Sequence, residues 1–289
     1  MKVLVLGLAK SGTTALAYKI HEALGAHAAL NFEPGKGAGA EDLELHRELT
    51  AAAGPLVTKN LVFPTTETRW DAIFDNAARY DRAVWIARDP RDIIISNFFY
   101  HWFGGHKAER AKFEEALART RRKEDDPGTV PFIDLVAGTM TESRAQLAAW
   151  QSSWYDILAG AAEGIASRMI VFRYEDFVDS RFDDLNAALG LALAGETRVP
   201  EEHQRVARTR GYGNWRRWFT AEDVEFFRPI LSRYLAVMGY DPDDWILEPV
   251  DRLPSAEGSG YMEKLYTRRD KPAAASLMRR VAARIRSLR

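Results

Sequence analysis

The chain opens with a short apolar run, Val3 to Leu6, that leads directly into a glycine-rich loop. A run without polar interruption is typical of a strand buried on both faces of a parallel sheet. Beyond the loop, Leu16, Ile20 and Leu24 recur at intervals of four, the spacing of one apolar helix face. The pattern therefore predicts a strand, a loop and a helix, in that order.

The same alternation continues to about residue 240. It predicts further strands at 55–59, 83–87 and 169–173. Helices are expected near 41–53, 66–79, 90–103, 109–122, 142–163 and 220–237. Strands that alternate with helices indicate an α/β protein, here a three-layer α/β/α domain around a central, mainly parallel sheet. We expect one such domain over residues 1–240.

The pattern dissolves from Asp241 onward, and residues 241–289 are expected to form an extension packed on the domain or trailing from it. Its last segment, 273–289, predicts a helix with an apolar side and a basic remainder. One short basic amphipathic segment binds membranes weakly. A surface helix or a tail is therefore favoured over a weak membrane-surface contact.

Composition narrows the function classes. Lys and Arg total 40 against 41 Asp and Glu, a net charge of -1, so the global charge favours no nucleic-acid partner. The chain has no cysteine, which excludes disulfides, thiol catalysis and cysteine-ligated metal sites. No apolar run approaches a membrane span, and the apolar start is followed by no cleavage site. We expect a cytoplasmic protein with no metal, and leave its oligomeric state open.

The first chemical candidate is the loop Gly7–Thr14, GLAKSGTT, between the first strand and helix. A loop in this position offers backbone N–H groups and a helix dipole to an anion. A loop for ATP or GTP has lysine directly after its last glycine. Here Thr13 stands in that place and the lysine, Lys10, lies inside the loop.

Three later segments contain further polar groups that could bind a phosphate. Arg88 follows a predicted strand, Asp89 and Pro90 suit a helix start, and Ser96 lies about two turns further on. Arg88 and Ser96 could then grip one phosphate, the alternative being an Arg88–Asp92 pair. The segment Tyr174-Glu175-Asp176 also leaves a strand, and RTRGYGNWRRWFT at 208–220 offers arginines and glycines to a phosphate.

Taken together, these four segments resemble sulfotransferases that use 3′-phosphoadenosine 5′-phosphosulfate (PAPS). Lys10–Thr14 is similar to their P-K-S-G-T-T loop, with Ala9 where proline is usual, and Arg88–Asp92 with Ser96 is similar to their 3′-phosphate motif. The later loop aligns without gaps from Arg208 to Trp215, with departures at Thr209-Arg210 and Asn214. The resemblance implies a P-loop-like sulfotransferase fold. It also implies a PAPS site made by Lys10, Ser11, Gly12, Thr13, Thr14, Arg88, Ser96, Tyr174, Arg208, Arg210 and Gly211.

The chain differs from the family at the position of the catalytic base. The cytosolic members carry K-T-H after a strand, whereas this chain has Lys59-Asn60-Leu61, so lysine is kept and histidine is not. Other branches use a glutamate soon after the first helix, which makes Glu33 the first candidate for the base. His101 and His106 are the next candidates, and Lys59 is a candidate for stabilising the sulfuryl oxygens. Lys10 would assist departure of the product, 3′-phosphoadenosine 5′-phosphate (PAP).

These features predict a PAPS-dependent sulfotransferase that acts on a hydroxyl or amine of a small-molecule, carbohydrate or lipid acceptor. The aromatic cluster Phe98, Phe99, Tyr100, Trp102 and Phe103 is expected to line an acceptor cleft or to lie in the core. Two alternatives stay open, a P-loop small-molecule kinase and a non-enzymatic nucleotide-binding module. The acceptor itself is not predicted.

Overall fold

The computed structural model describes residues 1–33, 39–103, 110–204, 209 and 211–267. Five strands form one sheet in the order β2-β3-β1-β4-β5, and every neighbouring pair is parallel. The strands are β1 (Lys2–Gly7), β2 (Ala29–Phe32), β3 (Leu56–Leu61), β4 (Arg82–Ala87) and β5 (Ile170–Arg173). The expected α/β class with a parallel sheet is confirmed.

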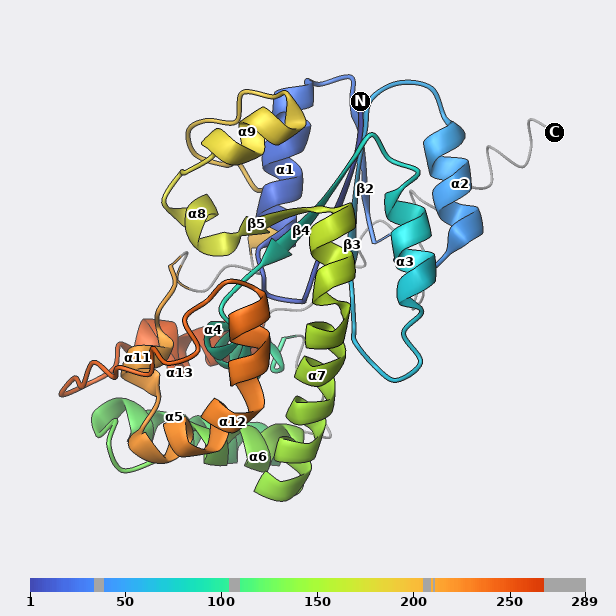
Figure 1. Ribbon diagram of the computed structural model, residues 1–289. Helices are drawn as coiled ribbons and strands as arrows, with labels where there is room; N and C mark the ends of the chain where they lie inside the picture. Colours follow the sequence, from blue (N-terminus) through green and yellow to red (C-terminus); the bar gives the residue numbers. More distant parts are fainter. Residues whose placement is uncertain (34–38, 104–109, 205–208, 210, 268–289) are drawn as a thin grey trace.

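Apolar clusters cover both faces of the sheet, which makes the three layers. Val3 and Val5 pack against α1 (Thr13–Leu24) and α9 (Asp183–Leu189) on one face. Leu4 and Leu6 face the other side, in the cluster that includes α3 (Trp70–Ala77), α4 (Pro90–Tyr100) and α7 (Arg144–Arg168). Figure 1 shows α1, α8 and α9 on one side of the strands and α3 and α7 on the other.

Helix starts follow their local sequence. The Asp89 carboxylate accepts a hydrogen bond from the Arg91 N–H, and Pro90 begins α4, as the sequence predicts. Thr220 and Asp223 form a reciprocal capping box at α12 (Ala221–Val237). Ser143 caps α7, which extends to Arg168. The remaining helices are α2 (Leu43–Ala51), α5 (Arg110–Asp125), α6 (Phe132–Met140), α8 (Tyr174–Val178), α10 (Glu201–Gln204), α11 (Trp215–Trp218), α13 (Ser259–Thr267) and the 3₁₀ turn η2 (Ser255–Glu257).

The structure contains two kinds of element that the sequence does not predict. β2 has four residues at the edge of the sheet and is only partly buried, so its apolar signal is weak. Several short helices, such as α6, α9 and α13, lie in segments for which the sequence predicts no helix. Their apolar residues find partners only in the folded protein, where tertiary packing overrides a weak local signal.

Residues 241–267 belong to the same core as the sheet. Trp245, Leu253, Met262 and Leu265 are buried in the cluster that contains Leu4 and Leu6. The buried Glu124 carboxylate at the end of α5 accepts hydrogen bonds from the Ser259 N–H and hydroxyl at the start of α13. The basic segment 273–289 lies outside the described residues.

Strand β1 lies between β3 and β4, so the chain leaves it toward one edge of the sheet and later returns to the other side. In open parallel sheets, ligands bind beyond the carboxyl ends of the strands at such a switch point. The loop Gly7–Thr14 leaves β1 at this position. The fold therefore places the first candidate motif where a ligand site is expected.

Candidate functional site

The loop between β1 and α1 has an unusual backbone. Gly12 and Lys10 both adopt left-handed conformations, with φ of 95° and 70°. For lysine that conformation costs about 1–2 kcal/mol, and such strain clusters at functional sites. Gly12 is also the N-cap of α1 and offers no side-chain cap to the first amides of that helix. N–H groups at a helix start that lack a side-chain cap are, together with the helix dipole, suited to bind an anion.

Glycine is required at position 12 for a second reason. A Cβ atom there would lie 2.5 Å from Cδ2 of Tyr174, the first residue of α8. Tyr174 therefore packs directly on the loop. The Ser11 hydroxyl donates to the Leu8 carbonyl at 2.8 Å, and Thr13 is buried, so the loop side chains are also held in place.

Arg88 connects the motifs to one another. It follows β4, is 6% exposed, and donates to the Lys10 carbonyl at 2.8 Å and to the Gly211 carbonyl at 3.2 Å. Its guanidinium carbon lies 4.2 Å from the centre of the Tyr174 ring, a cation–π distance. One side chain thus contacts the first loop, the later loop and the Tyr-Glu-Asp segment.

The Nε–H of Arg88 is buried and has no hydrogen-bond partner among the residues that the structure describes. Leaving a buried donor without a hydrogen bond costs about 1–3 kcal/mol. A bound ligand that supplied an acceptor oxygen would remove this cost. Ser96 is buried on α4, the helix that begins two residues after Arg88. Arg208 and Arg210, the other expected phosphate ligands, lie outside the described residues. The residues present fit an anionic ligand that brings further acceptor oxygens.

Asp92 anchors the later loop. Its buried carboxylate accepts hydrogen bonds from the Gly213 N–H at 2.6 Å and the Trp215 N–H at 3.2 Å. Its distance to the Arg88 guanidinium is 4.0 Å, so the Arg88–Asp92 pair, the alternative to phosphate binding in the sequence analysis, is present but longer than these two contacts. Burial raises the pKa of Asp92, and the charge of Arg88 opposes that rise. Sequence reasoning missed this anchoring role.

Glu33 and Lys59 lie at the carboxyl edge of the sheet and form an ion pair. Lys59 is buried near the end of β3, whereas the Glu33 side chain is 52% exposed just after β2. Burial lowers the pKa of Lys59, and the charge and hydrogen bond of Glu33 oppose that effect. The sequence proposed these two residues separately, and the structure brings them together.

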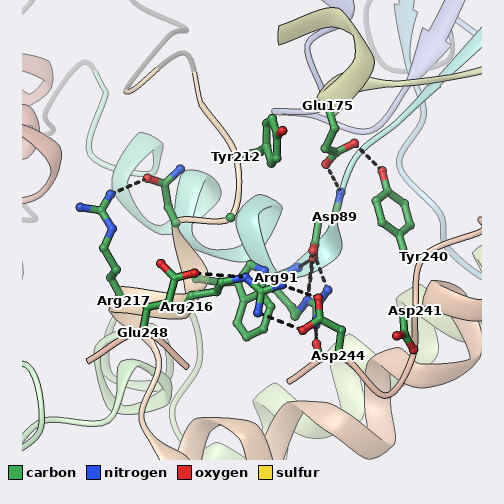
Figure 2. Close-up of a pocket in the computed structure, with 13 residues that line it drawn as sticks. Asp89, Arg91, Glu175, Tyr212, Arg216, Arg217, Tyr240, Asp241, Asp244 and Glu248 are labelled. Atoms are coloured by element: carbon green, nitrogen blue, oxygen red, sulfur yellow. Dashed lines mark hydrogen bonds and ion pairs between the residues drawn. The ribbon is translucent and has the colours of Figure 1, made fainter. Parts of the chain in front are cut away.

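Two cavities of similar size lie near these motifs. The first, about 350 Å³, is shown in Figure 2 and is lined by the charged groups around α11. Its arginines are already paired, Arg91 with Asp89, Arg216 with Asp244 and Arg217 with Glu257. Glu175 accepts from the Tyr240 hydroxyl and from the Asp89 N–H. We interpret this network as a support for the loop and for the start of α4.

The second cavity, also about 350 Å³, is mostly apolar. Leu8 and Ala9 of the first loop line it together with Tyr100, whose ring centre lies 3.9 Å from the Lys10 Nζ. His101 lines it as well, whereas His106 lies outside the described residues. Glu33 and Lys59 are not among its lining residues. Of the aromatic cluster, Phe98, Phe99 and Trp102 are buried in the core and only Tyr100 lines the cavity.

The position of the loop in an open parallel sheet defines an α/β protein with a candidate ligand site at its switch point. No family model matches the chain, and no curated protein matches it. Among solved structures, the chain is similar to mouse sulfotransferase SULT7A1 complexed with PAP. The TM-score is 0.49 and the sequence identity is 17%, over 81% of this chain and 84% of that chain. A likeness at this identity concerns the fold alone.

Among residues with a described position, no group of three or more His, Cys, Asp or Glu side chains is arranged to hold a metal ion. Within the same residues, none of the helices has the length and apolarity needed to cross a bilayer.

Proposed function

We propose that this protein is a sulfotransferase that transfers a sulfuryl group from PAPS to a hydroxyl group and releases PAP. The observation that carries the proposal is the position of Arg88, which contacts three separate motif segments through Lys10, Gly211 and Tyr174. Four motifs that are far apart in sequence thereby meet at one edge of the sheet. A chance resemblance in sequence would not require them to meet.

In this proposal the loop amides and the start of α1 bind the 5′-phosphosulfate, and Tyr174 lies beside the adenosine. Arg88 and Ser96, with Arg208 or Arg210 and the backbone at Gly211, bind the 3′-phosphate. Guanidinium groups are well suited to phosphate because they bind two oxygens at once. The unpartnered Nε–H of Arg88 supports this assignment, since it supplies one more donor.

The transfer step needs a base for the acceptor and a positive charge beside the leaving group. The acceptor oxygen forms a bond to sulfur while the bridging sulfur–oxygen bond breaks, and the electron pair leaves on the PAP phosphate. Lys10 stabilises that developing charge, and Lys59 stabilises the sulfuryl oxygens. Glu33 takes the proton of the acceptor hydroxyl. Its ion pair with Lys59 supports this role, because it holds the carboxylate beside the lysine proposed to contact the sulfuryl group.

The kinase alternative is less well supported. Thr13 occupies the place of the kinase lysine. β4 ends in Ala87 before Arg88, and β5 ends in Arg173, so an arginine rather than a magnesium-binding carboxylate stands directly at the end of each strand. A non-enzymatic binding module would share the anion site but would not need Glu33 or Lys59.

A thermal-shift comparison of PAP with ATP–Mg²⁺ tests the proposal. We expect PAP to raise the Tm and ATP–Mg²⁺ to raise it much less, with the PAP shift lost in Arg88→Ala. Stabilisation by ATP–Mg²⁺ and none by PAP would refute the proposal and favour the kinase. Binding of PAP without transfer of labelled sulfate to any acceptor would favour the binding module.

A further inference from the structure

The apolar cavity beside the first loop is large enough for a small organic molecule. Its volume of about 350 Å³ lies within the range of natural ligand sites, about 300–1,000 Å³. Its walls come from the first loop and from α4, α6 and α7, which are rigid elements, and from Phe63, which follows β3. A preformed cavity on such elements is suited to a ligand of defined shape.

The lining carries little charge. None of the described residues that line the cavity is Asp, Glu, Lys or Arg, and its polar side chains are mainly Asn97, His101 and Gln151. A carboxylate or a sugar with many hydroxyls would lose its hydration there and find few partners, which costs about 1–3 kcal/mol for each unpaired polar group. The lining therefore favours an uncharged ligand with few polar groups.

Aromatic side chains stand at the cavity while still exposed to water. Phe63 is 55% exposed and Trp150 is 37% exposed, although large apolar side chains are usually covered. Both make edge-on contacts with Trp154, at ring-centre distances of 6.5 Å and 6.0 Å. Exposed rings of this kind gain by packing against a flat apolar ring.

The cavity adjoins Lys10, the residue proposed to stabilise the leaving group. Tyr100 lines the cavity, and the ammonium group of Lys10 packs over the face of the same ring. Leu8 and Ala9 precede Lys10 in the same loop. A hydroxyl at that end of a bound molecule would thus lie on the side of the loop where sulfuryl transfer is proposed.

We propose that this cavity holds the acceptor, and that the acceptor is an uncharged molecule in which the hydroxyl is carried by an apolar, flat ring system. The proposal rests on the sulfotransferase function proposed above and adds the substrate class. It excludes free sugars and acidic acceptors, both of which the motif resemblance allows.

The test uses the full-length protein and three matched acceptors. These are 2-naphthol, the same ring with a carboxylate (6-hydroxy-2-naphthoic acid) and methyl β-D-glucopyranoside. With PAPS as donor, kcat/KM for 2-naphthol should exceed the other two by at least about 30-fold, a difference expected when a polar or charged group is left unpaired. Calorimetry with PAP-loaded protein measures binding of the same compounds without transfer.

Substitutions of Phe63 and Trp150, the exposed rings at the cavity mouth, test whether the acceptor binds in this cavity. Phe63→Glu should lower kcat/KM for 2-naphthol at least about tenfold, because it places a charge against an apolar ligand, and should leave the Kd of PAP unchanged. Trp150→Ala should lower kcat/KM in the same direction. Ile246→Glu, at a residue that is 71% exposed and does not line this cavity, is the matched control and should behave as wild type.

The outcomes separate the two proposals. If PAP binds but 2-naphthol neither binds nor accepts sulfate, or if the glucoside or the naphthoate is used as well, the acceptor class is wrong while the sulfotransferase proposal stands. An unchanged kcat/KM in both mouth variants would also overturn it. If PAP itself fails to bind, the proposed function fails, and calorimetry of 2-naphthol with the protein alone still reports whether the cavity binds the flat ring.

Discussion

Lys59 and Glu33 form an ion pair across the carboxyl ends of two neighbouring strands, β3 and β2. The Glu33 N–H also donates to the Lys59 carbonyl at 2.7 Å, so backbone and side chain both join the two residues. Glu33 adopts a left-handed conformation, with φ of 44°, directly after the strand. A strained, half-exposed carboxylate held against a buried cation beside a phosphate-type loop is an arrangement suited to proton transfer.

Replacement of this carboxylate tests its role as the base. We expect Glu33→Gln to lower kcat by about 10²- to 10⁴-fold, the usual contribution of a general base, with little change in KM for PAPS. Glu67→Gln, at an exposed glutamate, is the control. Steady-state rates with PAPS and 2-naphthol provide the measurement. A normal kcat in Glu33→Gln together with a large loss in His101→Asn would transfer the base to His101, which lines the cavity.

Arg88 is expected to determine specificity for the 3′-phosphate. Arg88→Lys keeps the charge but loses the planar fork, so the Kd of PAP should rise at least about tenfold, as expected for loss of a charged hydrogen bond. AMP is PAP without the 3′-phosphate, and its Kd should change much less. Calorimetry with both ligands gives the ratio, with Arg69→Lys as the surface control. An equal loss for both ligands would place Arg88 away from the 3′-phosphate.

The loop glycine offers a matched pair of variants. Gly12 and Gly54 have nearly the same φ, 95° and 91°, but a Cβ at Gly54 would meet no atom within 4 Å. Gly54→Ala should therefore cost only backbone strain, about 1–2 kcal/mol of unfolding free energy, and keep PAP binding. Gly12→Ala should also displace Tyr174 and abolish the PAP thermal shift. Equal PAP binding in the two variants would contradict the close packing of Tyr174 on the loop.

Asp92 is predicted to position the later loop for the ligand. In Asp92→Asn one carboxylate oxygen that accepts the Gly213 or Trp215 N–H becomes an NH₂ group, so the loop should loosen. We expect a Tm lower by several degrees and a Kd for PAP at least about tenfold higher. Asp156→Asn, in an exposed pair with Arg233, is the control. A lower Tm with an unchanged Kd would leave Asp92 with a purely structural role.

The buried Lys123 predicts how stability depends on pH. Its ammonium donates to the Pro127 and Val130 carbonyls, and burial lowers its pKa to about 8, with Asp223 and Asp126 opposing the shift. An unfolded lysine titrates near about 10.4, so between about pH 8 and pH 9.5 the unfolded chain binds more protons than the folded protein. Stability contributed by this group therefore rises with pH in that window.

Lys123→Met should remove this slope, by up to about 1.4 kcal/mol per pH unit. Denaturant unfolding of wild type, Lys123→Met and the exposed control Lys264→Met at several pH values between 7 and 9.5 measures the difference. Lys19 and Lys59, whose pKa values burial also lowers, are common to all three proteins and cancel in the comparison. Identical slopes in wild type and Lys123→Met would contradict the prediction.

Much of the fold follows from local pattern. Strongly apolar strands such as β1 and β4 and the capped start of α4 at Asp89 and Pro90 were predictable, because their signals lie within a few residues. The edge strand β2 and the helix α6 were not, because their side chains are apolar without a clear period or without full burial. Their conformation depends on neighbours that are distant in sequence.

The site divides in the same way. The motifs around Lys10, Arg88 and Tyr174 can be read from the sequence, since a phosphate-type loop requires glycine, a cation and a helix start in a fixed order. Sequence does not show that Arg88 would contact two of the other motifs and the Lys10 carbonyl, or that Glu33 would pair with Lys59. It also does not separate the aromatic residues of the core from those that line the cavity.

By itself, the sequence determined the class of fold and placed the candidate motifs at strand ends, because both depend on local residue order. The tertiary structure decided which groups act together, since Glu33 and Lys59 meet only when β2 pairs with β3. It also decided the chemical character of the cavity, because the residues that line it come from four elements and the segment after β3, which fold together around the loop. Such convergence depends on the packing of distant segments, which no local pattern records.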